Sequence, residues 1–188
     1  MVLPVCLYGH PVLRDVAEDI TPDYPKLAEI ISNMWDTMYD SEGIGIAAPQ
    51  VGISAPILVI DVDVMKDSFP ELAGVKLTMI NPIVEVVEDG EVKSREEGCL
   101  SLPGIHESVT RTEKVKVEWV DENFTPQSAE FSGYLARVIQ HENDHLQGMV
   151  FIDHISPIRK QLIRSKLKNI VDGKVRCSYR TRSASLKR

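Results

Sequence analysis

Apolar residues between positions 27 and 38 recur with the spacing of one face of a helix, at i, i+3, i+4, i+7, i+8 and i+11. The stripe consists of Leu27, Ile30, Ile31, Met34, Trp35 and Met38. This period predicts an amphipathic helix whose apolar face lies in the core. Asp23 is suited to cap such a helix, and Pro25 is suited to its first turn. We therefore expect the helix to begin at Asp23.

The middle of the chain carries the patterns of β-strands. A continuous apolar run over 57–62 predicts a buried strand, and alternation over 113–120 predicts a half-buried one. Further strands are expected at 76–80 and 83–88, separated by Asn81-Pro82, and near 127–131. The segment Glu88-Asp89-Gly90-Glu91 has the composition of a hairpin turn.

A second apolar stripe follows, made of Leu135, Val138, Ile139 and Leu146. It predicts a helix bounded by Gly133 and Gly148, and another helix is expected from Pro157 to Val171. Several strands and one central helix indicate an α+β fold with mixed, mostly antiparallel sheets and a C-terminal helix. We expect one domain over residues 1–172 and a basic, flexible tail over residues 173–188.

Composition narrows the class of protein. The 188 residues are 43% hydrophobic and 26% charged, which is ordinary for one globular domain. The three cysteines, Cys6, Cys99 and Cys177, are widely spaced and odd in number, which favours a reducing compartment over a disulfide framework. No apolar run approaches the roughly 20 residues of a membrane span. We therefore expect a cytoplasmic protein with no membrane partner.

Charge is divided sharply along the chain. Residues 159–188 hold 11 Lys/Arg and one acidic residue, whereas residues 1–158 carry a net charge of −17, so that the whole chain is at −7. A basic end on an acidic body indicates an anionic partner, because lysine and arginine neutralise phosphates without reading bases. We expect this end to be a candidate for docking on RNA. A solvated helix with a disordered tail is the plain alternative.

The segment Gln140–Gly148 (QHENDHLQG) contains the pattern H-E-x-x-H. On a helix, His141 and His145 lie one above the other and can share a metal ion. Glu142 points about 100° around the helix, where it cannot be a third ligand on that face but can reach a water at the metal. The pattern therefore predicts a metal-assisted hydrolase with Glu142 as its base.

Two histidines need a third ligand. The metzincin pattern fails at its last position, which is Phe151, and no Glu follows Glu142 in this chain. Asp153 and Asp172 remain as weak candidates. Cys99, in Glu97-Gly98-Cys99-Leu100-Ser101, is the best candidate upstream. His10, His106 and His154 lack the spacing of ligands, and Cys6 and Cys177 are expected to have no role in the chemistry.

A glycine-rich segment, Gly43–Gly52 (GIGIAAPQVG), precedes the first predicted strand. Its glycines and alanines allow something to approach the backbone closely. A phosphate-binding loop is disfavoured, because there is no Lys-Ser/Thr pair and no preceding strand. Gln50 is a polar amide in an apolar setting, so it needs a hydrogen-bonding partner, which we expect to be substrate.

Together, the segments Gly43–Gln50, Glu97–Ser101 and Gln140–Gly148 resemble the peptide deformylase family. They match its motifs G-x-G-φ-A-A-x-Q, E-G-C-L-S and Q-H-E-x-D-H-L-x-G position for position, and the resemblance extends over about residues 1–170. It implies hydrolysis of the N-formyl group of nascent formyl-methionyl peptides, with release of formate. Because nascent chains emerge at the ribosome, it also makes ribosomal RNA the expected partner of the basic residues 159–188. It also implies one divalent metal ion, natively Fe(II), with zinc, nickel or cobalt accommodated.

The resemblance assigns roles to particular residues. Cys99, His141 and His145 are implied as metal ligands, with a fourth position open for water. Glu142 is implied as general base and then general acid, and the Gln50 amide and Leu100 N–H as donors to the oxyanion.

Peptide binding is expected at the glycines of two of these motifs. The backbone around Ile44, Gly45 and Gly98 can pair with an extended peptide. Ile44 and Val138 are natural walls for the methionine side chain, although Arg137 is unexpected beside an apolar pocket. Arg111 and Asp144 are expected either to support the metal-binding helix or to form an ordinary surface ion pair.

Two other functions compete with this interpretation. One is a zinc metallopeptidase or amidase that uses the same helix with Asp153 or another third ligand. The other is a non-enzymatic metal- or RNA-binding protein that acts through its basic end, which would leave Glu142 and Gln50 without a purpose.

Overall fold

The computed structural model describes residues 1–87 and 90–184. Its α-helices in that part of the chain are α1 (Leu27–Asp40), α2 (Gly133–Leu146) and α3 (Pro157–Val171). Its strands are β1 (Val5–Cys6), β2 (Gly45–Ala47), β3 (Ile57–Asp61), β4 (Lys76–Val86), β5 (Val92–Gly98), β6 (His106–Thr112), β7 (Lys114–Val120), β8 (Pro126–Ser132) and β9 (Thr181–Arg182). The predicted α+β class is confirmed.

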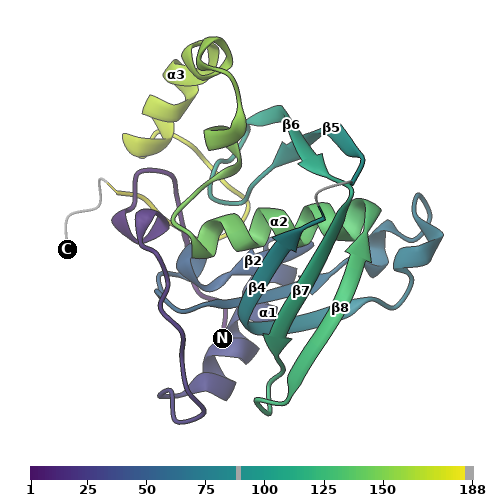
Figure 1. The fold of residues 1–188 in the computed structure, drawn as a ribbon. Coiled ribbons are helices and arrows are strands. Elements are labelled where there is room, and N and C mark those ends of the chain that lie inside the picture. The colour runs from purple at the N-terminus through teal and green to yellow at the C-terminus, as the bar shows by residue number, and fades with distance from the viewer. Residues whose placement is uncertain (88–89, 185–188) are drawn as a thin grey trace.

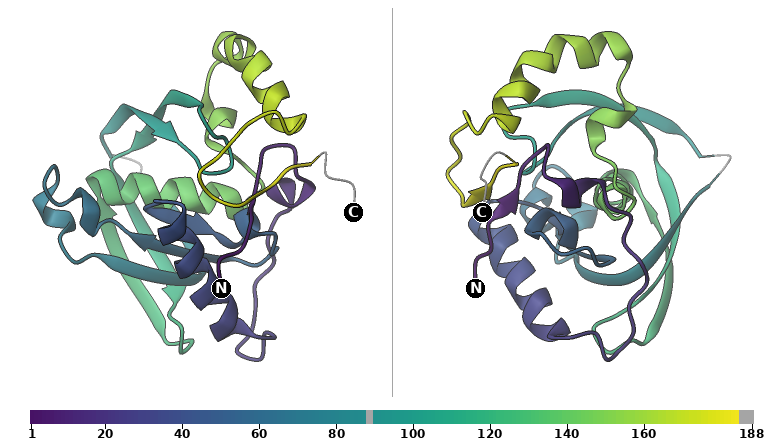
Figure 2. Two further views of the ribbon diagram at one scale, coloured as in Figure 1. Left: turned by 180° about the vertical axis from the view of Figure 1, so that it is seen from behind. Right: turned by 90° about the vertical axis from the view of Figure 1, so that its left-hand side faces the viewer.

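Helix α2 lies at the centre of the molecule. A sheet in the order β2-β3-β4-β7-β8, antiparallel throughout, curves around one side of it, and the antiparallel pair β5-β6 lies on the other side (Figure 1). Figure 2 (right) shows the helix end-on, enclosed by these two layers, with α1 and α3 outside them. A helix in this position can bury an apolar face and still present polar residues to one cleft.

The core explains why α2 holds its orientation. Its apolar side chains Leu135, Ala136 and Ile139 pack on the inner face of the five-stranded sheet. The other face of β3 packs on α1, through residues such as Met34 and Met38. Each fully buried aliphatic side chain contributes about 1.5–3 kcal/mol. Because β3 packs on α2 with one face and on α1 with the other, its buried side chains are apolar without alternation, as the sequence pattern predicted for a buried strand.

Two predicted boundaries are wrong. Helix α1 begins at Leu27, not Asp23, because the Thr21 hydroxyl donates to the Asp23 carboxylate and Lys26 adopts a left-handed conformation with φ of 58°. The chain therefore turns before the helix starts.

The strands expected on either side of Asn81-Pro82 form one strand, β4, with a register shift between Ile80 and Ile83. Asn81 has φ of 50°, and its side chain is bonded to the backbone of Ile20. The irregularity therefore bends the strand without ending it.

The turn predicted at Glu88–Glu91 includes residues outside the described part of the chain. The strands on either side of it belong to different sheets, since β4 pairs with β7 and β5 pairs with β6. Helix α2 occupies the predicted range, and α3 matches the predicted range of 157–171. No helix in the described residues is long and apolar enough to cross a membrane.

The flexible tail predicted from residue 173 is corrected as far as residue 184. Strand β9 pairs in parallel with β1 at the other end of the chain, and Ser183 is buried. Figure 2 shows the two terminal segments side by side. The basic composition of this segment predicted a solvated tail, but its Val175 and Tyr179 pack into the apolar clusters of the body.

Candidate metal centre and active site

Helix α2 carries the two histidines as predicted. The His141 and His145 rings are 5.4 Å apart between centroids, on the same side of the helix. The helix ends before Gly148, whose φ is 68°, and a Cβ at this position would come within 2.6 Å of the Arg14 carbonyl oxygen. Glycine is therefore required for the close turn that ends α2.

Cys99 meets these histidines from the other layer, one residue beyond the end of β5. Its Sγ lies 3.3 Å from Nε2 of His145. One donor atom from each of Cys99, His141 and His145 can be chosen so that all three lie within 4.8 Å of one another, and within the described residues this is the one such cluster. The three residues that the sequence predicted as ligands are thus brought together.

The donor set fits a divalent metal ion. Tetrahedral coordination at about 2.3 Å from sulfur and 2.0–2.1 Å from nitrogen requires donors about 3.3–3.6 Å apart, so the cluster is close to the needed size. Burial lowers the pKa of His145 well below its ordinary value, which keeps this imidazole neutral as a ligand must be. Burial also disfavours a charged His141, but hydrogen bonds with Cys99 and Glu97 raise its pKa well above the ordinary value. A metal ligand must be a neutral imidazole, so a metal ion that binds at His141 displaces this proton.

Glu142 lies beside the cluster and is 4% exposed. Burial raises the pKa of Glu142 to about 7, and its Oε2 has no hydrogen-bond partner. A carboxyl group in this setting can take up and return a proton near neutral pH. A Cβ at Gly45 would lie 2.6 Å from Oε1 of Glu142. Only glycine at position 45 therefore leaves room for the carboxylate.

Gln50 is buried in the short helix Ala48–Val51. Its Oε1 accepts a hydrogen bond of 2.8 Å from the Ala47 N–H. Its Nε2 lies 3.3 Å from the Ser101 hydroxyl oxygen and 3.4 Å from Cys99 Sγ. The amide predicted to need substrate as its partner thus has partners within the protein, and its NH₂ group is held at the edge of the metal cluster.

A cleft of about 500 Å³ opens onto these residues. Ile44, Gly45, Gly98, Leu100 and Val138 line it, together with Gln50, Cys99, His141 and Glu142. His106 and the C-terminal segment 176–179 also line the cleft and were not predicted there. Tyr134, seven residues before His141 on the same helix, lines it as well. Nine of the ten residues assigned to the site from sequence therefore line one cavity, and the tenth, His145, is fully buried beside it, with Nε2 3.3 Å from Cys99 Sγ.

Glu97 is the residue that sequence reasoning missed. It accepts hydrogen bonds from Arg111 Nε and Arg137 Nη1 at 2.7 Å each, from Arg111 Nη2 at 3.0 Å and from His141 Nδ1 at 2.9 Å. Burial opposes its ionisation, but these bonds lower the pKa of Glu97 to about 2. The carboxylate thereby orients the His141 ring so that Nε2 faces Cys99.

The hydrogen-bond network around Glu97 also shows the contacts of Arg111, Asp144 and Arg137, whose roles the sequence left open. Arg111 Nη2 also donates to Asp144 at 2.9 Å, and both side chains are buried, so this is a structural ion pair behind the helix and not a surface pair. Arg137 also lines the cleft, but its guanidinium group is bonded within the network, with its remaining hydrogen bonds to the carbonyls of Lys93 and Val109. The one feature of the sequence that could have indicated this network is an acidic residue, Glu97, two positions before the predicted ligand Cys99.

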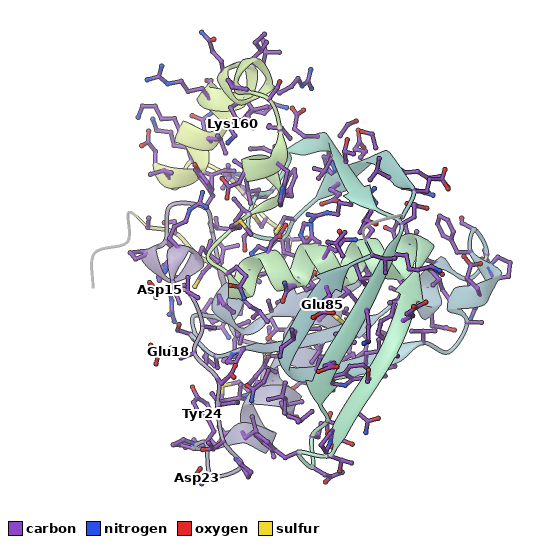
Figure 3. The ribbon with its side chains drawn as sticks, in the orientation of Figure 1. Asp15, Glu18, Asp23, Tyr24, Glu85 and Lys160 are labelled. Atoms are coloured by element: carbon purple, nitrogen blue, oxygen red, sulfur yellow. The ribbon has the colours of Figure 1, made fainter. Side chains whose placement is uncertain are left out.

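Glu97→Gln is expected to weaken metal binding by about 10–100-fold, because His141 loses the charged partner that orients it. The free energy of unfolding should fall by about 3 kcal/mol, since two buried guanidinium groups lose their carboxylate. Chelator competition and thermal denaturation measure both effects. Glu85→Gln is the control, because Glu85, labelled in Figure 3, is exposed on β4 and does not line the cleft. Equal metal affinity in the two variants would contradict the role of Glu97.

The alternative ligands are excluded by their contacts. Asp153 pairs with Arg14 at 2.6 Å and accepts from the Val150 N–H, and Asp172 pairs with Lys168 and Lys174. Phe151, at the last metzincin position, stacks on the His141 ring with centroids 5.9 Å apart.

The remaining histidines and cysteines lie outside the cluster. His154 donates to Asp144, and His10 accepts from Val12 N–H. Cys6 is fully buried, whereas Cys177 unexpectedly lines the cleft. All three cysteines are free, as the sequence predicted.

An α+β fold with two histidines and a buried glutamate on its central helix, and a cysteine facing them, defines a metal-dependent hydrolase. The family model of polypeptide deformylase matches residues 2–161. The chain is 47% identical to the peptide deformylase of Flavobacterium johnsoniae, over 100% of this chain and 99% of that one, and 45% identical to that of Flavobacterium psychrophilum over the whole of both.

Solved structures agree with the relatives in sequence. The peptide deformylase of Legionella pneumophila superposes with a TM-score of 0.80 at 34% identity, over 94% of this chain and 99% of that one. That of Thermotoga maritima superposes with a TM-score of 0.74 at 38% identity, over 84% and 99%. The chain belongs to the polypeptide deformylase family, as the three motifs predicted, and it is a hydrolase that removes the N-formyl group from nascent polypeptides.

Proposed function

We propose that Cys99, His141 and His145 hold one divalent metal ion and that Glu142 performs the proton transfers of deformylation. The observation that carries this assignment is the convergence of the three donor atoms within 4.8 Å of one another, next to a buried carboxylate. The metal, when bound, acidifies a water molecule and polarises the formyl carbonyl as a Lewis acid.

Glu142 acts at both ends of the reaction. Its carboxylate takes a proton from the water whose oxygen forms the new bond to the formyl carbon. The same proton then goes to the amine nitrogen as the carbon–nitrogen bond breaks, so the products are formate and a free N-terminal methionine. The pKa of about 7 suits a group that must be a base in one step and an acid in the next.

Two donors serve the oxyanion that develops on the formyl oxygen. The Gln50 NH₂ group lies at the edge of the cluster, held there by the bonds of its own oxygen to Ala47 and of its nitrogen to Ser101. The Leu100 N–H follows the ligand Cys99 directly in the chain and lies at the same cleft. Removing one such donor costs about 10²–10³-fold in turnover in comparable enzymes.

The peptide itself binds along strand edges. Within the described residues, β2 pairs only with β3 and β5 pairs only with β6, so each presents one free edge toward the cleft. Gly45 and Gly98 stand on these edges, where an extended peptide can add to the sheet. Ile44 and Val138 line the cleft as walls for the methionine side chain.

The assignment is tested by measuring formate and free amine from a formyl-Met peptide and from the same peptide without its formyl group. Metal-loaded protein should release formate from the first and leave the second intact. Cleavage of the unformylated peptide would instead support a zinc metallopeptidase, the alternative that the family membership does not favour.

We propose Fe(II) as the native metal, although the sulfur and two nitrogens also suit zinc. Protein purified without oxygen should lose most of its activity in air, because Fe(II) and the Cys99 thiolate both oxidise. Replacement by nickel or cobalt should protect the activity under the same exposure. Metal analysis beside the activity assay is the measurement, and an air-stable, zinc-loaded preparation with full activity would contradict iron.

We also propose that α3 docks the protein on ribosomal RNA, which fits a cytoplasmic location beside nascent chains. Figure 3, in which Lys160 is labelled, shows α3 at the edge of the molecule with its side chains projecting outward. Arg159 pairs with Glu107 and Lys168 pairs with Asp172, but Arg164 and Lys166 are exposed and form no ion pair within the described residues. These two cations are therefore available to phosphates.

Replacing Arg164 and Lys166 by Gln should reduce co-sedimentation with ribosomes at low salt and lower the slope of its salt dependence by about 2, one for each lost contact. Activity on a free formyl-Met peptide should be unchanged. The control replaces Lys26 and Lys66 by Gln, which removes the same charge elsewhere on the surface. Equal sedimentation of both variants and the parent would end the proposal. Truncation is a poorer test, because it removes the C-terminal segment that lines the cleft.

A further inference from the structure

The two ends of the described chain are joined beside the active site. The Val5 N–H donates to the Arg180 carbonyl and the Leu7 N–H donates to the Arg182 carbonyl, both at 2.9 Å, as β1 and β9 pair in parallel. We call β1, β9, Tyr8 and Tyr179 the terminal clamp. The terminal clamp gives a defined structure to residues 179–182, which the sequence predicted to be part of a flexible tail.

The terminal clamp contacts the loop that carries the cysteine ligand. The Tyr179 hydroxyl donates to the Leu100 carbonyl oxygen at 2.7 Å, and the Tyr8 N–H donates to the Ser101 carbonyl oxygen at 2.8 Å. The Gln50 NH₂ group contacts the side chains of the same loop, the Ser101 hydroxyl and Cys99 Sγ. The loop Cys99–Ser101 is therefore held by two sets of contacts: the terminal clamp bonds its backbone carbonyls, and Gln50 contacts its side chains.

Tyr179 both packs in the core and lines the active-site cleft. Its ring is half-buried in the apolar cluster that also contains Leu100 and residues of α1. Tyr179 and its neighbours Arg176, Cys177 and Ser178 line the same cleft as Cys99 and His141. A hydrogen bond to Leu100 thus restrains the residue whose N–H is the proposed oxyanion donor, at a point where a shift of about 1 Å can cost about 10²-fold in rate.

We propose that Tyr179 is a positioning residue for deformylation, whose hydroxyl holds Leu100 so that its N–H donor and the neighbouring Cys99 keep their places at the cleft. The inference rests on the proposed function of Cys99 and Leu100. It gives the C-terminal segment a role at the active site that is separate from the basic surface of α3.

Tyr179→Phe tests this in the full, metal-loaded chain, since it removes the hydroxyl and keeps the ring. We expect kcat per bound metal on a formyl-Met peptide to fall about tenfold, because Leu100 loses the hydrogen bond that holds its N–H donor in place. KM should stay within about twofold, because the substrate contacts themselves remain. The Leu102 amide, which donates to the Cys99 carbonyl at 2.9 Å, should exchange faster with solvent.

Tyr39→Phe is the matched control. The Tyr39 hydroxyl donates to Asp61 Oδ2, also at 2.7 Å, but on the exposed end of α1 and outside the cleft. This variant should match the parent in kcat, KM and exchange at Leu102. A purely structural Tyr179 would lower the melting temperature and leave kcat per bound metal unchanged.

The outcomes separate the two proposals. Failure of the metal-loaded parent to release formate would overturn the proposed function itself. An active parent with the same kcat per bound metal in Tyr179→Phe would overturn only the positioning role. A fall in kcat of similar size in Tyr39→Phe would also overturn it, because the effect would then not belong to the terminal clamp.

Discussion

Glu142→Gln is expected to abolish nearly all formate release while the protein keeps its metal. The amide has the shape of the carboxyl group but cannot accept the proton of the attacking water or deliver it to the amine. Loss of a general acid–base group costs about 10²–10⁴-fold. Because Glu142 is not one of the three clustered donors, metal content should be equal in variant and parent. Steady-state formate release, normalised to bound metal, measures the effect.

Glu118→Gln is the control for this experiment, since Glu118 is exposed on β7 and lies outside the cleft. It makes the same chemical change without touching the site, so it should behave as the parent. More than a tenth of the parent rate in metal-loaded Glu142→Gln would defeat the general-base role. Loss of metal from that variant would instead place the carboxylate among the ligands.

Cys99→Ser is expected to bind metal much more weakly and to lose activity with it. A serine hydroxyl is neutral near pH 7 and a poor substitute for thiolate, whose charge and polarisable sulfur suit transition metals. The remaining two imidazoles leave a site with too few ligands for tight binding. Chelator competition measures the affinity, and activity measured with excess metal separates weak binding from a direct effect on the reaction.

Cys177→Ser offers a matched comparison for metal affinity. Cys177 lines the same cleft and receives the same substitution, but it is not one of the three clustered donors. Its variant should bind metal as the parent does. Equal affinity in Cys99→Ser would remove Cys99 from the coordination sphere and reopen the search for a third ligand.

The local parts of the fold were predictable because their signals are local. Helix α2 is bounded by Gly133 and Gly148, and α3 begins after Ser156, whose side chain accepts from the Arg159 N–H. The early start predicted for α1 fails because Asp23 has a competing partner in Thr21. Side-chain bonds of this kind decide boundaries that propensity cannot.

The site was predictable in its residues but not in its supports. Gln50, Cys99 and His141 come from three distant segments, and only their combined motifs indicated that they meet. Glu97 reaches Arg137 and His141 only because β5-β6 packs against α2, and residue spacing along the chain does not reveal this packing. Tyr179 was overlooked because its neighbours are basic, and a parallel pair of two-residue strands leaves almost no pattern in a sequence.

The central claim is that one metal ion, held by Cys99, His141 and His145, and one carboxylate, Glu142, together produce deformylation. The most direct test is to titrate metal-free protein with Fe(II) in the absence of oxygen and to follow formate release from a formyl-Met peptide. The rate should rise in proportion to bound metal and reach its limit at one ion per chain. Full activity in the metal-free protein, or no formate at one bound ion per chain, would contradict the claim.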